Sequence, residues 1–130
     1  MPEKVSVREG IQIIQVESYG DITTTDLQGS LNAVLKIRQD RGLTRVLVDA
    51  TKETSFPSIV PVFEFGSELA EAVRGVTFAI ATAPEMRHKM EFLETVVLNR
   101  GGYVKVFDSV DAALAWLTEK PNKPDADDGK

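Results

Sequence analysis

The side chains that most often carry out catalytic chemistry are scarce in this sequence, which has one histidine and no cysteine among 130 residues. Without cysteine there is no thiol nucleophile, disulfide or cysteine-based zinc site, and one histidine cannot form a multi-histidine metal site. His88 falls on the polar side of an expected helix, between Arg87 and Lys89. We interpret it as a solvated surface residue rather than a general base, because no positioning partner is visible. We therefore expect no metal, no cofactor and no enzymatic activity.

Asp49 is the most interesting polar candidate because it ends the apolar run at residues 45–50. Such a run is typical of a central strand, and open α/β sheets place ligand crevices at the carboxyl ends of their strands. The structural alternative, which we favour, is a carboxylate that accepts backbone N–H groups of the following loop. Arg100 could reach the same region or simply solvate a helix end. A metal-free enzyme using Asp49 and Arg100 is therefore the weakest of three hypotheses.

Aromatic side chains form a second candidate group, at Phe56, Phe63, Phe65 and Phe92. Aromatic residues at helical spacing usually belong to a core. The alternative is the lining of an apolar pocket between the second and third helices, and Phe65, at the edge of the apolar side of its helix, favours that alternative.

The elements that position these residues follow from periodicity and capping signals. Strands are expected at 5–8, 11–16, 45–50, 76–82 and 103–107, and helices at 23–42, 58–73, 86–99 and 109–117. Residues 51–57 are polar and turn-rich, and we expect a loop there. Gly42 is expected to end the first helix in the left-handed conformation, and Asp108 or Ser109 to cap the last one.

This order predicts an α/β fold with a mixed sheet, in which an N-terminal β-hairpin is followed by repeating β-α units (ββα-βα-βα-βα). Adjacent Ile13 and Ile14 interrupt the alternation of the second strand, so either a bulge lies there or both faces of the strand are covered. We expect one domain at 1–119 and a disordered tail at 120–130.

Three segments together resemble the bacterial STAS-like (SpoIIAA-like) family, which is distantly related to the lipid-carrying CRAL-TRIO domains. They are residues 46–49, the helix end at 92–101, and residues 106–107 followed by the Ala-Trp-Leu helix at 112–117. The resemblance implies the SpoIIAA-like fold. In the anti-anti-sigma branch of this family, phosphorylation of a serine at the start of the helix after the central strand controls docking. The Asp-Ser-Ser-Gly run of that branch is absent here, and Ser58 is the nearest counterpart.

Net charge excludes one class of partner. A charge of −5 and a pI near 4.9 argue against a nucleic-acid surface, which needs clustered basic residues. No apolar run reaches the length of a membrane span, and the N-terminus does not resemble a signal peptide. We expect a cytoplasmic protein that is not an integral membrane protein.

The leading hypothesis is a non-catalytic STAS-like module that binds a protein partner or a small apolar ligand such as a lipid. The alternative is a partner-switching regulator of the anti-anti-sigma type, phosphorylated on Ser58 or Ser55. A homodimer through the hairpin edge or a patch at Phe65 is also expected. The candidate ligand site comprises Asp49, Phe56, Ser58, Phe63, Phe65 and Arg100.

Overall fold

The computed structural model describes residues 3–55, 59–72 and 74–119, with backbone only for 59–62 and 72. The described strands are β1 (Glu3–Arg8), β2 (Ile13–Asp21), β3 (Arg45–Ser55), β4 (Thr77–Thr82) and β5 (Tyr103–Phe107). The helices are α1 (Thr24–Arg41), α2 (Ile59–Ala72), the short 3₁₀ helix η1 (Pro84–Met86), α3 (Arg87–Asn99) and α4 (Val110–Thr118).

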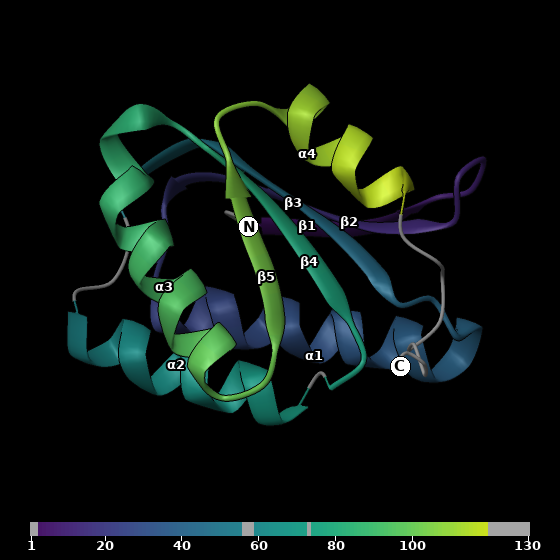
Figure 1. Ribbon diagram of the computed structural model, residues 1–130, viewed down its shortest axis with the longest axis horizontal. Coiled ribbons are helices and arrows are strands. Elements are labelled where there is room, and N and C mark those ends of the chain that lie inside the picture. Colours follow the sequence, from purple (N-terminus) through teal and green to yellow (C-terminus); the bar gives the residue numbers. More distant parts are fainter. Residues whose placement is uncertain (1–2, 56–58, 73, 120–130) are drawn as a thin grey trace.

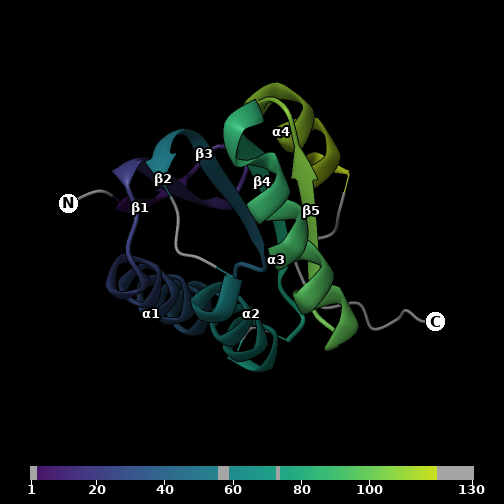
Figure 2. The same ribbon diagram turned by 90° about the vertical axis from the view of Figure 1, so that its left-hand side faces the viewer.

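The strands form one mixed sheet in the order β1-β2-β3-β4-β5. β1 runs antiparallel to β2, and the remaining neighbours are parallel. Of the described helices, α1, α2 and α3 lie on one face of the sheet and α4 lies on the other (Figures 1 and 2). The predicted α/β class, the mixed sheet and the hairpin at one edge are confirmed.

Both faces of β2 are covered, which decides between the two readings of the adjacent isoleucines. Ile14 packs in the core under α1, α2 and α3, whereas Ile13 packs in a second core under α4. The pairing of β1 with β2 is continuous from Glu3 opposite Ser18 to Arg8 opposite Ile13. No bulge interrupts this pairing, so Ile13 and Ile14 are adjacent because both faces of β2 are buried.

The first helix begins and ends as its sequence predicts. Thr23 caps α1 and forms a capping box with Asp26, in which the Asp26 N–H donates to Thr23 Oγ1 at 3.1 Å and the Thr23 N–H donates to Asp26 Oδ2 at 2.9 Å. Gly42 ends the helix at φ 71°, a conformation that disfavours residues with a Cβ atom. Ser109 is the cap of α4.

β3 is longer than predicted. The predicted loop at residues 51–57 is wrong for residues 51–55, which belong to the strand. These residues remain extended and pair with β2 as far as Asp21 opposite Ser55. Glu17 pairs with Asp49 and Tyr19 pairs with Lys52, so β3 carries one more residue than β2 between these pairs. This bulge reverses the alternation of side chains as far as Glu53, and a second register shift follows between the Gly20–Glu53 and Asp21–Ser55 pairs.

Candidate functional site

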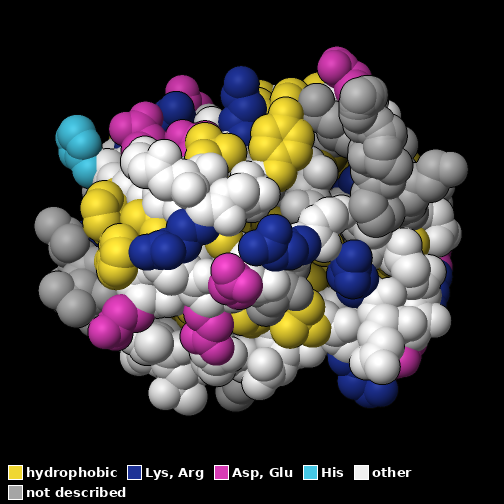
Figure 3. All heavy atoms as spheres, turned by 60° about the horizontal axis from the view of Figure 1, so that its bottom comes forward, with side chains coloured by type: hydrophobic (Ala, Val, Ile, Leu, Met, Phe, Trp, Pro, Cys, Tyr) yellow, Lys and Arg dark blue, Asp and Glu magenta, His cyan; other side chains and the backbone are white. Residues whose placement is uncertain are grey.

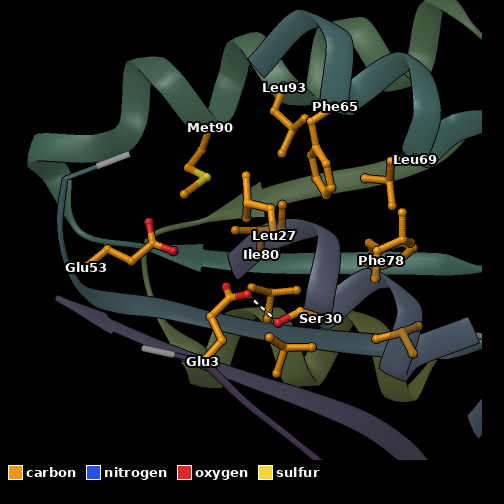
Figure 4. A pocket seen from close by; sticks show the side chains of 14 residues that line it. Glu3, Leu27, Ser30, Glu53, Phe65, Leu69, Phe78, Ile80, Met90 and Leu93 are labelled. Carbon is orange, nitrogen blue, oxygen red and sulfur yellow. Dashed lines mark hydrogen bonds between the residues drawn. The ribbon is translucent and has the colours of Figure 1, made fainter. Parts of the chain in front are cut away.

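A cavity of about 70 Å³ lies between the sheet and helices α1, α2 and α3. Apolar side chains from both layers line most of it, and Glu3, Ser30 and Glu53 stand at one end (Figure 4). The apolar lining comprises Val16, Leu27, Leu31, Val34, Val48, Phe65, Leu69, Phe78, Ile80, Met90 and Leu93.

Glu3 is held by two serine hydroxyl groups from different elements. Ser18, directly opposite on β2, donates to Glu3 Oε2, and Ser30 of α1 donates to Glu3 Oε1. Ser18 is almost completely buried. Each carboxylate oxygen of Glu3 therefore has a hydroxyl donor, as a partly buried carboxylate requires.

Glu53 reaches the cavity because of the bulge in β3. Strict alternation from Val48 would turn the side chain of residue 53 to the face covered by α4. The extra residue of the bulge brings it instead to the face covered by α1, α2 and α3. Its neighbour on β2 is Gly20, at φ 73°, which has no side chain to occupy the adjoining space. Glu53 is only 6% exposed, and its Oε1 has no hydrogen-bond partner.

The pKa values of both carboxyl groups lie above the ordinary value. Burial, the largest effect, together with the nearby Glu3 charge raises the pKa of Glu53 to about 8, although a hydrogen bond with Ser18 opposes the shift. Burial also raises the pKa of Glu3, while hydrogen bonds from Ser18 and Ser30 oppose the rise and Asp26 adds to it. Glu53 is therefore mostly neutral at pH 7, because an ionised carboxylate is unfavourable in this buried site.

The acidic end of the cavity adjoins two surface grooves. Glu3 and Ser30 also line a groove of about 440 Å³ between β1 and α1, with Asp26 on its wall. Glu53 also lines a groove of about 350 Å³, with Lys52 and Glu85 beside it. The two carboxyl groups thus stand between the apolar interior and the surface.

Comparison with known proteins places the chain in a family. The model of the SpoIIAA-like family matches residues 13–118. The chain belongs to the SpoIIAA-like family. A similar solved structure is an uncharacterised protein of the DUF3478 family with a SpoIIAA-like fold from Shewanella loihica PV-4. It is 18% identical, with a TM-score of 0.55 over 88% of this chain and 91% of that chain. No curated protein matches the sequence.

The predicted ligand residues of this SpoIIAA-like protein do not form one site. Among the described ones, only Phe65 lines the cavity. Asp49 shares the α4 face with Leu47, and its Oδ1 accepts the Thr51 N–H at 3.1 Å and the Thr51 hydroxyl at 2.6 Å. The favoured interpretation of Asp49 as a carboxylate that accepts a backbone N–H is confirmed, although the donor, Thr51, belongs to β3 and not to the predicted loop.

Phe63 and Arg100 form a separate pair on the surface. The Arg100 guanidinium lies 5.3 Å from the centre of the Phe63 ring, and Phe63 is 44% exposed.

Ser55 donates to Asp21 Oδ1 at 3.0 Å at the end of β3. Phe56 and Ser58 lie outside the described residues.

Glu3 and Glu53 were not predicted as site residues. Glu53 lies in a polar stretch typical of a loop, and only the bulge turns it inward. Glu3 precedes the expected first strand. The one usable signal was that Glu3 begins β1 and Glu53 lies near the end of β3, and both strands pair with β2. The pairing itself could not be deduced from the sequence.

The described surface on the side of helices α1, α2 and α3 carries side chains of several kinds. Figure 3 shows basic, acidic and hydrophobic side chains interspersed there. His88 is exposed, as predicted. Within residues 3–55, 59–72 and 74–119, no group of acidic residues and histidine is arranged to hold a metal ion. No helix in that part of the chain is long and apolar enough to span a membrane.

Proposed function

We propose that this SpoIIAA-like protein is a non-catalytic binding module that holds a small, mostly apolar ligand between the sheet and helices α1, α2 and α3. The observation that carries the proposal is the apolar cavity with Glu53 buried and incompletely hydrogen-bonded at its end. Ligand sites commonly combine an apolar lining with a few polar groups that orient the ligand.

Cavity volume limits the size of the ligand. An engineered apolar cavity of about 150 Å³ takes up benzene, and the volume here is about 70 Å³. The space suits a short aliphatic group, or the end of a longer chain whose remainder follows one of the adjoining grooves. A whole lipid tail does not fit within it.

The catalytic alternative has little support. Asp49 and Arg100 lie on opposite sides of the sheet, since Asp49 shares the α4 face and Arg100 contacts Phe63 of α2. No described nucleophile and base are paired within the cavity lining. A phosphate on Ser55 would lie beside the Asp21 carboxylate, which would repel it. Protein partners and a homodimer stay predictions.

Native mass spectrometry of protein purified from its own host tests the proposal. We expect a bound species, released on denaturation and identifiable by extraction. Leu69→Phe, which narrows the cavity, should reduce its occupancy at least several-fold. Leu98→Phe, at an exposed position of α3, should leave occupancy unchanged. An apo mass from every preparation, or equal occupancy in both variants, would contradict the proposal.

A further inference from the structure

Glu53 leaves an unfilled hydrogen-bonding position inside the cavity. Its side chain is more than nine-tenths buried, and Oε1 has no partner, whereas both oxygens of Glu3 accept serine hydroxyls. Figure 4 shows the carboxyl groups of Glu3 and Glu53 directed toward the same space from β1 and β3. Buried polar atoms are rarely left without a partner, so such an atom at the end of a cavity points to a ligand.

The end of the cavity formed by Glu3 and Glu53 carries acidic side chains and no basic one from the described lining. None of the described residues that line the cavity is a lysine, arginine or histidine. Among the described residues that line the two adjoining grooves, the other charged groups are Asp26 on α1, Lys52 on β3 and Glu85 on η1, and only Lys52 is basic. A buried pair of carboxyl groups without an internal cation lacks the positive charge that usually compensates such groups.

We propose that the ligand is an amine with a short apolar substituent, whose ammonium group binds between Glu3 and Glu53 while its hydrocarbon part occupies the cavity. This inference rests on the proposed function and specifies the chemical class of the ligand. An ammonium group supplies a positive charge, so Glu53 releases its proton when the ligand binds, and it supplies three N–H donors, one of which can reach Glu53 Oε1. The apolar lining then accommodates the hydrocarbon.

Other head groups complement the site less well. An alcohol offers one donor and no charge. A carboxylate ligand places a further negative charge beside the two acidic side chains, so its binding is disfavoured by like charge. A quaternary ammonium group carries the charge but has no N–H donor for Glu53 Oε1. The expected order of affinity is therefore primary amine, then alcohol, then carboxylate.

The test compares probes of equal chain length by NMR titration at pH 7 with the full chain. The probes are n-butylammonium, 1-butanol and butyrate, and the reporter is the methyl group of Met90, which lines the cavity. Ala113, in the α4 core, reports non-specific effects on the other face. We expect n-butylammonium to bind about tenfold more tightly than 1-butanol, with shifts at Met90 and none at Ala113.

Variants separate recognition by the glutamates from general attraction to an acidic protein. Glu53→Gln should bring the affinities for n-butylammonium and 1-butanol to within about twofold of each other. Glu68→Gln removes a charge from the exposed side of α2 and should preserve the preference. If Glu53→Gln does not fold, Glu3→Gln provides the same comparison.

The outcomes separate the inference from the proposed function. If 1-butanol or butyrate binds as tightly as n-butylammonium, or if the preference persists in Glu53→Gln, the amine is the wrong class, although the cavity still binds ligands. If no probe shifts Met90 at any concentration, both the inference and the binding function are wrong.

Discussion

On the face of the sheet covered by α4, β4 contributes Ala79 and Ala81, whereas on the opposite face the same strand contributes Phe78 and Ile80. The small side chains allow α4 to lie close to the sheet, and every buried member of that core has no exposed surface. The larger side chains hold three helices away from the sheet, and space remains among them. One strand with alternating side-chain sizes therefore gives a closed face and a face with a cavity.

The same contrast applies to polar groups. Asp49, on the α4 face, is satisfied locally by Thr51. Glu53, turned to the other face by the bulge, has one oxygen without a partner. A carboxylate that accepts hydrogen bonds from neighbouring residues stabilises the local backbone. A carboxyl group inside a cavity that has no such donor for one oxygen can accept a hydrogen bond from a ligand.

The largest expected difference between the faces comes from truncating a buried leucine. Leu117 of α4 is fully buried, whereas Leu69 of α2 borders the cavity. Leu117→Ala should lower the free energy of unfolding by about 3 kcal/mol, and Leu69→Ala by about 2 kcal/mol, because fewer contacts are lost beside existing space. Urea denaturation measures both. A larger loss for Leu69→Ala would mean that the cavity face is the better packed one.

Enlarging side chains should give the opposite contrast. Ala79→Val adds volume under α4, where Ala79 is fully buried, and should lower the free energy of unfolding by about 2 kcal/mol. Val48→Ile adds volume at the cavity and should change it by less than about 0.5 kcal/mol. Thermal and urea unfolding of the two variants provide the measurement, and equal destabilisation would remove the distinction.

Replacing Glu53 should change how stability depends on pH. Between the ordinary pKa of 4.5 and the folded value of about 8, the unfolded chain releases a proton that the folded chain keeps. Stability of the wild type therefore falls as pH rises through this window, and the Glu53 contribution amounts to roughly 1 kcal/mol per pH unit. Below pH 4.5 Glu53 is protonated in both the folded and the unfolded state, so it no longer makes stability depend on pH.

Glu53→Gln removes that contribution, so the variant should gain stability relative to the wild type as pH rises from 6 to 7.5. Urea unfolding at several pH values measures the difference, with Glu68→Gln as the control that should show no such trend. A constant difference between wild type and Glu53→Gln across this range would show that Glu53 ionises normally.

The smallest effect is expected at the surface pair. Phe63→Ala removes an exposed ring that lies under Arg100 and should change the free energy of unfolding by less than about 0.5 kcal/mol. It should also leave n-butylammonium binding unchanged, because Phe63 does not line the cavity. A loss of binding in this variant would return Phe63 to the ligand site, as the sequence had suggested.

Periodicity and capping signals predicted most of the fold, because they report local preferences. The left-handed Gly42 at the end of α1 and the Ser109 cap of α4 were predicted and are observed. The extension of β3 was missed because its polar residues resemble a loop, although pairing with β2 holds them extended. Tertiary pairing here overrides local preference.

The candidate site was less predictable, because it depends on which strands meet. Glu3 and Glu53 are fifty positions apart in the sequence numbering, and they approach one another only because β1 and β3 flank β2. A one-residue bulge then decides which face Glu53 occupies. Phe65 was predicted as a pocket residue from its place at the edge of the apolar side of its helix, but the expected surface patch there is wrong, because Phe65 is buried in the core.

Diffraction from crystals pressurised with xenon tests the central claim most directly, because xenon enters apolar cavities without needing a specific ligand. The account predicts xenon density between the sheet and helices α1, α2 and α3, among Leu69, Phe78 and Ile80, and none under α4. Density under α4, or none beside these three residues, would contradict it.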